Sequence, residues 1–306
     1  MCRRVANPDR ILAFCLDDPM TTEHRTVPAP GADLGYDVHG DLSAGVPLFM
    51  FGSPMEASEF AELAAQFADL PVITYDPRGT GRSRRTDAAD RTTTAEHADD
   101  LRRILADLAV PAIDLFASSG GAVNALALLG STAPAVRTAV LHEPPIAEYL
   151  PDRDVVSATT RALSELYRTA GFGAAMAKFI DMVARSGPLP DSYPTEPGPD
   201  PAMFGLPAVG DGDALFVLNR DTTAFVPDLE ALRAGPARLV IGYGAVSGEQ
   251  LPGRAARALA DRLGSAATEF PGHHGGFAAP DRGGDPVAFA ARLRNVLGLP
   301  TIDGDR

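Results

Sequence analysis

The sequence predicts an α/β protein with a mainly parallel sheet, and two observations lead to this class. Short apolar runs that suit strands alternate with segments of helical spacing between residues 46 and 141, and the alternation resumes at residue 237. Strands that alternate with helices indicate βαβ crossovers, which join parallel strands. Residues 146–230 interrupt the pattern, so we expect an insertion in a sheet domain.

The expected elements follow from the period of the apolar residues. Runs bounded by turn residues predict strands at 46–51, 71–75, 112–116, 137–141, 237–241 and 267–270. Apolar residues three or four positions apart predict helices at 60–67, 101–108, 122–129, 254–263 and 289–297. Residues 24–27 and 34–38 fit an antiparallel hairpin at the sheet edge, and residues 1–22 are expected to form a poorly ordered extension.

The insertion is expected to be a helical cap over a core made of residues 23–145 and 231–300. Residues 154–186 have a helical pattern with a break at Gly171, and residues 213–225 have a helical pattern again. Between them, residues 187–212 are rich in Pro and Gly and predict a loop.

Composition excludes several classes of protein. The net charge of −13 over 306 residues argues against nucleic acid or an anionic membrane as the main partner, and no apolar run is long enough to span a bilayer. The two cysteines, Cys2 and Cys15, suggest neither a disulfide framework nor a metal site. Because the first residues do not form a signal peptide, we expect a cytoplasmic protein. The net charge is compatible with a monomer or a homodimer, and both states stay open.

A turn of small residues separates an expected strand from an expected helix. The turn consists of Ala117-Ser118-Ser119-Gly120-Gly121. A serine nucleophile on a parallel sheet needs small residues two positions before and after it, because strand and helix approach closely there. Ala117 and Gly121 satisfy this condition for Ser119, whereas Ser118 would place Phe116 at a small position. We therefore predict Ser119 as a nucleophile.

Acyl transfer also needs two backbone N–H groups directed at the developing oxyanion. Gly120 follows the nucleophile and can supply one of them. The Gly52-Ser53 turn ends an earlier strand and can supply the other, with Ser53 preferred over Gly52.

Residues 75–83 and the turn around Ser119 together resemble the α/β-hydrolase fold superfamily. Tyr75-Asp76-Pro77-Arg78-Gly79-Thr80-Gly81-Arg82-Ser83 is similar to the signature turn after the family's fourth strand. The resemblance covers residues 24–298 and implies a mainly parallel eight-stranded sheet flanked by helices. Within the signature turn, Arg78 and Ser83 are expected to be structural.

A serine nucleophile needs a base whose pKa lies near neutrality, which favours histidine. His97 has charged neighbours on an expected helix and is predicted to be a surface residue. In the family, the base follows the last strand on a glycine-rich loop, often as Pro-Gly-x-His, and residues 271–274 match this pattern. The resemblance implies His274 as the base, with His273 as the alternative.

The orienting acid departs from the usual family pattern. No Asp occurs between Asp228 and Asp261, Ser247 stands about where the acid is expected, and Glu249 comes slightly later. The end of the sixth strand offers Glu143 instead, on the same edge of the sheet. A serine hydrolase with its acid after strand six resembles the zearalenone-type lactonases, whose motif also begins His-Glu. We predict Glu143 as the acid and keep Glu249 as the alternative.

The cap is expected to close over this edge of the sheet and to line a pocket for a small-molecule substrate. The candidate lining residues are Met55, Ser118, Phe172, Met176, Phe179, Met203, Phe204 and Phe225. No cluster has metal-ligand spacing and no dinucleotide fingerprint is present, so we expect neither metal nor cofactor.

These residues predict a cofactor-free serine hydrolase that cleaves a carboxylic ester or lactone of a hydrophobic small molecule through an acyl-enzyme. Two alternatives stay open. One is an amide or C–C bond hydrolase, or a perhydrolase, with the same three catalytic residues. The other is a catalytically silent ligand-binding protein of the same fold, because fold alone does not fix function.

Overall fold

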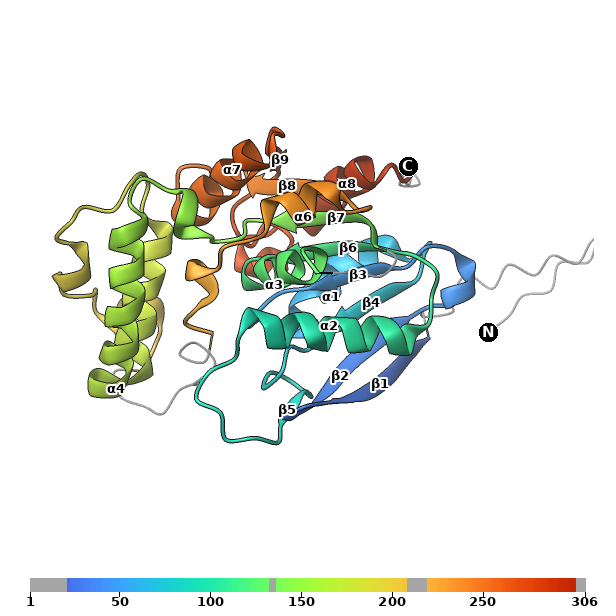
Figure 1. Cartoon of the computed structure of the whole chain (residues 1–306), viewed down its shortest axis with the longest axis horizontal. Coiled ribbons are helices and arrows are strands. Elements are labelled where there is room, and N and C mark those ends of the chain that lie inside the picture. The colour runs from blue at the N-terminus through green and yellow to red at the C-terminus, as the bar shows by residue number, and fades with distance from the viewer. Residues whose placement is uncertain (1–20, 132–135, 208–218, 301–306) are drawn as a thin grey trace, which may run out of the picture.

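The computed structural model describes residues 21–131, 136–207 and 219–300, and within them it shows a nine-stranded sheet covered by helices (Figure 1). The strands are β1 (Thr22–Ala29), β2 (Ala32–His39), β3 (Leu48–Phe51), β4 (Val72–Tyr75), β5 (Arg84–Arg85), β6 (Ile113–Ser118), β7 (Val136–His142), β8 (Arg238–Gly244) and β9 (Thr268–Phe270). The helices are α1 (Ala61–Ala64), α2 (Thr94–Leu108), α3 (Gly120–Leu129), α4 (Arg153–Ala184), α6 (Leu229–Ala234), α7 (Leu251–Leu263) and α8 (Pro286–Leu297).

The sheet combines an antiparallel edge with a parallel centre. The strand order is β1-β2-β4-β3-β6-β7-β8-β9, and the two-residue strand β5 pairs with β2 beside this path. The pairs of β2 with β1, β4 and β5 are antiparallel, and the pairs from β4 through β9 are parallel. The predicted hairpin and eight-stranded main path are confirmed. Of the predicted extension 1–22, residues 1–20 lie outside the described residues, and Thr22 begins β1.

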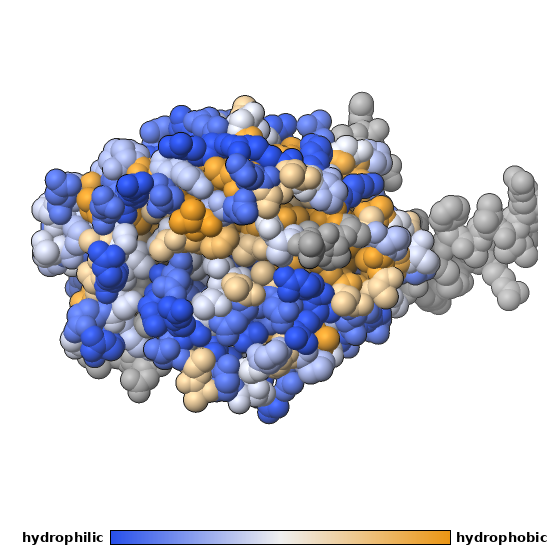
Figure 2. Space-filling view, viewed as in Figure 1, coloured by the Kyte–Doolittle hydropathy of each residue, from blue (hydrophilic) through white to orange (hydrophobic). Residues whose placement is uncertain are grey.

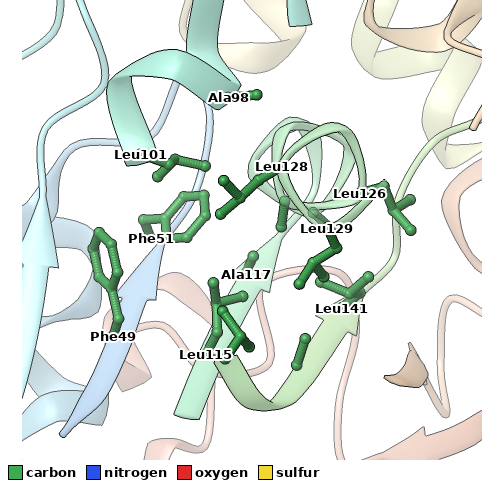
Figure 3. Packing of buried hydrophobic residues seen from close by; sticks show 14 of the residues in the cluster. Phe49, Phe51, Ala98, Leu101, Leu115, Ala117, Leu126, Leu128, Leu129 and Leu141 are labelled. Carbon is green, nitrogen blue, oxygen red and sulfur yellow. The ribbon is translucent and has the colours of Figure 1, made fainter. Parts of the chain in front are cut away.

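Helices cover both faces of the sheet, which explains why the central strands are buried along almost their whole length. On one face, buried residues of α2, α3, α6 and α7 form one apolar cluster with alternate strand residues such as Leu115 and Leu141, and Figure 3 shows part of this cluster. On the other face, α1 and α8 pack on Phe116 and Val140. Because successive strand residues point to opposite faces, every position in β6 is buried.

Helix α2 shows how local sequence fixes an element that borders the site. Thr93 caps it: its hydroxyl accepts the N–H of Glu96 at 3.2 Å, and the Glu96 carboxylate accepts the N–H of Thr93 at 2.7 Å. This reciprocal capping box satisfies two N–H groups that the helix cannot pair internally. The helix therefore begins at Thr94, earlier than the apolar spacing alone predicted.

The segment 146–230 contains α4, whose two halves lie beside each other at one end of the sheet (Figure 1). The chain turns sharply at Gly171, where φ is 85° and ψ is 179°, a conformation open essentially to glycine. The predicted break is confirmed at this residue. Of the predicted helix 213–225, residues 213–218 lie outside the described residues, and the rest holds only a short 3₁₀ turn, Thr222–Ala224.

The signature turn at residues 75–83 has a structural role, as expected. The Arg78 guanidinium donates to both carboxylate oxygens of Asp100 on α2, at 2.7 and 2.5 Å, and both side chains are buried. Ser83 accepts the N–H of Gly35 at 2.8 Å and donates to the carbonyl of Asp76. These bonds tie the turn to the sheet edge and to α2, away from the residues predicted to be catalytic.

Hydrophilic residues cover most of the face shown in Figure 2, with hydrophobic residues exposed between them across the middle of the view. No helix within the described ranges has both the length and the apolar character required to cross a bilayer.

Candidate active site

Ser119 occupies a strained turn between β6 and α3. Its φ of 56° and ψ of −130° lie outside the helical and strand regions, and a non-glycine residue with positive φ is uncommon. Its N–H donates to the carbonyl of His142 at 2.9 Å, and its own carbonyl accepts the N–H of Ala122 at 3.0 Å. Such strain costs on the order of 1–3 kcal/mol and persists only where the surroundings hold it.

Two glycines let the turn fit against the loop that follows β3. A Cβ at Gly120 would lie 2.6 Å from the backbone oxygen of Ser53, and a Cβ at Gly121 would lie 2.8 Å from the Cα of Gly52. Any larger residue at either position would push the loop away. Ser53 and Gly120 therefore lie side by side, and Gly52 packs behind them.

The fold brings together His274 and Glu143, which are 131 residues apart in the chain. The Nδ1 of His274 lies 2.5 Å from Oε2 of Glu143. Burial alone would raise the pKa of Glu143, but the hydrogen bond from His274, the electrostatic interaction with His142 and His274 and the bond from Ser247 outweigh it and lower the pKa to about 2. An ionised carboxylate can only accept, so Nδ1 carries the proton and Nε2 is left as an acceptor.

Glu143 is held by the backbone and by the loop after β8. Its φ of 51° is again positive, and its N–H donates to the carbonyl of Gly242 at 2.9 Å. Its Oε1 accepts the N–H of Gly244 at 2.8 Å and the hydroxyl of Ser247 at 2.5 Å. Ser247 thus stands where an acid was expected and instead donates to Glu143, which follows the neighbouring strand β7.

The alternatives weighed for the acid and the base lie elsewhere. Glu249 is 71% exposed and accepts from Arg257 at 2.7 Å. The ring of His273 is fixed within its own loop, where Nδ1 accepts the N–H of Gly275 at 3.0 Å and Nε2 lies 3.1 Å from the carbonyl of Gly283.

Ser119 and His274 open onto one cavity of about 460 Å³ between the sheet and α4, a volume ordinary for a small-molecule site. Ser53 and Gly120 line it too, as do four of the residues predicted to line a pocket: Met55, Phe172, Met176 and Phe179. Sequence reasoning missed several other lining residues: Pro54, Pro145, Thr160, Leu163, Ser164, Ile180, Met182, Val183, Ala184, Asn219, Arg220, Thr222, Thr223, Gln250, Leu251 and Pro252.

Four residues that were expected to line the pocket do not. Ser118 is fully buried on the opposite face of the sheet, because it alternates with Ser119, and its hydroxyl lies 3.4 Å from Nδ1 of His142. Met203 and Phe204 are exposed on a short 3₁₀ turn. Phe225 is partly buried against the apolar core cluster and does not line the cavity.

His97 was predicted to be a surface residue, and this prediction is wrong. Only 4% of it is exposed, and its Nε2 lies 2.8 Å from Oδ1 of Asn219. Its position four residues before Leu101 puts it on the buried face of α2, which is the signal that sequence reasoning overlooked. Asn219 lines the cavity, so His97 supports the cavity wall from behind.

His142 is fully buried beneath the site. Its Nε2 has no hydrogen-bond partner, and its ring meets those of Phe270 and Phe289 edge-on at 5.7 and 5.3 Å between centroids. Burial lowers the pKa of His142 to about 4, so the ring is neutral at physiological pH. Among the residues that the structure describes, no group of three His, Cys, Asp or Glu side chains is arranged to hold a metal ion.

Mild acid is expected to destabilise the protein through its two buried histidines. Burial lowers the pKa of His97, like that of His142, to about 4. Between about pH 6.5 and about pH 4, the unfolded chain therefore binds more protons than the folded protein does. Above that window, the free energy of unfolding keeps its full value. Within the window it falls as the pH falls, and at about pH 5 the loss is on the order of 2 kcal/mol per histidine. Urea unfolding at about pH 7.5 and about pH 5 measures the loss.

The variant His97→Gln provides the control for this prediction, because glutamine can keep a bond to Asn219 but cannot titrate. Its free energy of unfolding should fall less between the two pH values than that of the unaltered protein. An equal fall in both proteins would show that His97 contributes nothing to the acid sensitivity.

Comparison with known proteins agrees with this architecture. Residues 48–209, just over half of the chain, match the family described as alpha/beta hydrolase fold. The chain is 26% identical over 284 residues to the uncharacterized hydrolase YraK of Bacillus subtilis, covering 91% of this chain and 97% of that protein.

Solved structures show the same fold at low sequence identity. MGS-M2, an alpha/beta hydrolase enzyme from a Medee basin deep-sea metagenome library, superposes with a TM-score of 0.66 at 16% identity, covering 92% of this chain and all of that one. An enol-lactonase from Burkholderia xenovorans LB400 gives 0.61 at 16% identity over 90% and 100%. A thermophilic esterase from Thermogutta terrifontis gives 0.59 at 20% identity over 90% and 98%. With its parallel sheet, its strained serine turn and this family match in agreement, the chain belongs to the α/β-hydrolase fold family.

Proposed function

We propose that this protein is a serine hydrolase that cleaves a carboxylic ester or lactone of a hydrophobic small molecule through an acyl-enzyme. One observation carries the proposal: Ser119 shares its cavity with a histidine whose Nδ1 proton is held by an ionised, buried carboxylate. A hydroxyl becomes nucleophilic when such a base stands beside it, and the base works when a third group orients it.

The first half of the reaction forms the acyl-enzyme. The Ser119 Oγ attacks the carbonyl carbon while its proton passes to Nε2 of His274. The N–H groups of Gly120 and Ser53 hold the oxyanion; that of Gly120 is the first of α3, where no carbonyl of the helix can accept it and the helix dipole is positive. When the tetrahedral intermediate collapses, His274 gives its proton to the leaving alcohol oxygen.

The second half releases the acid. His274 takes a proton from water, the resulting hydroxide attacks the acyl carbon, and the proton returns to Ser119 as the ester bond to the enzyme breaks. Glu143 stabilises the imidazolium in both halves without accepting its proton, consistent with the lowered pKa of this carboxyl. In a lactone, the acid and the alcohol leave as one ring-opened molecule.

The cavity lining supports an apolar substrate. The second half of α4 contributes Phe172, Met176, Phe179, Ile180, Met182 and Val183. We propose that residues 146–230 act as a cap whose apolar side chains remove water from the acyl group, which strengthens the electrostatic interactions at the oxyanion. The similar folds described as an enol-lactonase and a thermophilic esterase support the ester or lactone class.

Covalent labelling with a fluorophosphonate probe tests the proposal most directly. The probe reacts with activated serines, so intact mass should rise by one adduct and peptide mapping should place it on Ser119. A panel of aryl esters, aliphatic lactones and matched amides then separates ester cleavage from amide cleavage. A folded protein that takes up no label and opens no ester or lactone would favour the ligand-binding alternative.

A further inference from the structure

Ser247 is fully buried in the segment 244–247, where β8 ends and the chain turns toward α7. Its N–H donates to the carbonyl of Gly244 at 3.1 Å, and its own carbonyl accepts the N–H of Gln250 at 2.9 Å. Helix α7 packs closely against it, because a Cβ at Gly253 would lie 2.3 Å from the Ser247 carbonyl oxygen. The backbone that carries the Ser247 hydroxyl is therefore fixed from both sides.

The Ser247 hydroxyl determines which oxygen of Glu143 faces the histidine. Among the described residues, its proton has two acceptors within reach, Oε1 of Glu143 at 2.5 Å and the carbonyl of Gly244 at 3.3 Å, and the nearer, charged oxygen makes the stronger bond. The N–H of Gly244 donates to the same Oε1 at 2.8 Å, which leaves Oε2 for Nδ1 of His274. The terminal torsion of a glutamate has only broad minima, so hydrogen bonds must fix the plane of this carboxylate.

The same segment is bonded to the loop that carries the histidine. The N–H of Ala245 donates to the carbonyl of Phe270 at the end of β9, and the N–H of Val246 donates to the carbonyl of Gly272, both at 2.9 Å. His274 follows two residues later. The segment therefore bonds to the carboxylate through its first and last residues and to the histidine loop through the two residues between them, so that it holds both groups in one frame.

We propose that Ser247 is a positioning residue for the reaction, whose hydroxyl orients the Glu143 carboxylate so that Oε2 holds the Nδ1 proton of His274. The inference rests on the proposed function and extends it, because it names a residue that acts on the base through the acid. Ser247 is not among the residues that line the cavity, so its loss should leave substrate binding intact. The loss should instead slow the step in which His274 takes the proton of Ser119, and so lower kcat.

Removal of the hydroxyl at position 247 tests this role. In Ser247→Ala, kcat on the best ester should fall by roughly tenfold or more, as expected for the loss of a hydrogen bond to a charged group. KM should stay unchanged, because the lost bond does not involve the bound substrate. Ser247→Thr and Ser247→Val form a second pair of equal shape, in which only Thr keeps a hydroxyl, and kcat should be higher in the Thr variant by a similar factor.

Thr159→Val controls for the loss of a buried hydroxyl as such. Thr159 is fully buried on α4, its hydroxyl donates to the carbonyl of Val155 at 2.8 Å, and it is not among the residues that line the cavity. Thermal unfolding of each variant measures the effect on stability. Thr159→Val should leave kcat unchanged whatever its effect on stability.

The Nδ1 proton of His274 gives a readout that does not depend on turnover. A proton in so short a bond to a carboxylate should resonate far downfield of the backbone amides in a proton NMR spectrum, and isotope-labelled histidine together with Glu143→Gln assigns it. In Ser247→Ala the resonance should move upfield, because the carboxylate has lost one of the donors that hold it toward Nδ1. In Thr159→Val it should not move.

The outcomes separate this inference from the proposed function. If hydrolysis depends on Ser119 but kcat is the same with and without a hydroxyl at position 247, the serine hydrolase proposal stands and the role of Ser247 is overturned. If no ester or lactone is cleaved, the proposed function fails and the NMR measurement decides. A resonance that moves upfield in Ser247→Ala supports the orientation of Glu143 by Ser247, and an unmoved or absent resonance overturns it.

Discussion

Ester hydrolysis by the Ser119→Ala variant is expected to fall by roughly 10⁴-fold or more, and labelling by the fluorophosphonate probe is expected to disappear. The reason is that Ser119 supplies the oxygen that forms the acyl-enzyme in the proposed mechanism. Alanine removes the attacking oxygen and leaves His274 and Glu143 in place. The measurements are kcat/KM on the best ester of the panel and intact mass after labelling.

Ser118→Ala is the matched control, because it removes the hydroxyl of the adjacent serine. Ser118 is buried on the other face of the sheet and bonds only weakly to His142, at 3.4 Å. This variant should keep the label on Ser119. If the label is lost in Ser118→Ala and retained in Ser119→Ala, the nucleophile is Ser118 and not Ser119. That result would overturn the proposed mechanism.

Glu143→Gln is expected to lower kcat by roughly 10³–10⁴-fold at neutral pH, the size of effect seen when the acid of a serine protease is made neutral. The glutamine oxygen can still accept from Gly244 and Ser247, which places its NH₂ group toward Nδ1 of His274. An NH₂ group can only donate, so Nδ1 must accept and the proton moves to Nε2. The imidazole is then in the tautomer that cannot take a proton from Ser119.

Glu249→Gln makes the same chemical change at the other candidate acid. Because Glu249 is exposed and paired with Arg257, kcat should stay within about twofold of the unaltered protein, as surface changes away from a site usually do. Thermal unfolding of both variants checks that the comparison is between folded proteins. A larger loss in Glu249→Gln than in Glu143→Gln would refute the assignment of the acid.

Much of the fold could be predicted because its signals are local. The central strands are short and mainly apolar, since helices cover both faces of the sheet. The break in α4 falls at Gly171, whose φ of 85° is a conformation that favours glycine. The strained turn at Ser119 could be predicted for the same reason, because its flanking small residues are adjacent in the sequence. The family prediction is confirmed by the match over residues 48–209.

The proposed acid was harder to predict than the nucleophile, because its assignment depends on contacts between distant residues. The sequence left Glu143 and Glu249 open, and the choice depends on which one lies against a histidine 131 residues away from Glu143. Ser247 could be placed near the site, but its bond to Glu143 spans 104 residues and has no local signature.

The polar residues that line the cavity, such as Asn219 and Arg220, could not be predicted for a related reason. The helical spacing of α4 indicates Met176 and Phe179, but nothing near Arg220 in the sequence shows that it lines the same cavity. His97 had a local signal in its spacing from Leu101, yet its partner Asn219 lies 122 residues away. Phe204 was misplaced because the Pro- and Gly-rich stretch around it has no periodicity from which burial could be inferred.

The order of the site residues along the chain has a consequence for biosynthesis. Ser119, Glu143 and the proposed oxyanion donors all precede residue 146, whereas the strand that carries the partners of Glu143 and the loop that carries His274 come more than ninety residues later. A chain that emerges from the ribosome N-terminus first therefore exposes its serine long before the base exists. In the proposed mechanism, the Ser119 hydroxyl of the nascent protein is not activated. Hydrolytic activity begins only when the last strands join the sheet, so that activity indicates complete folding.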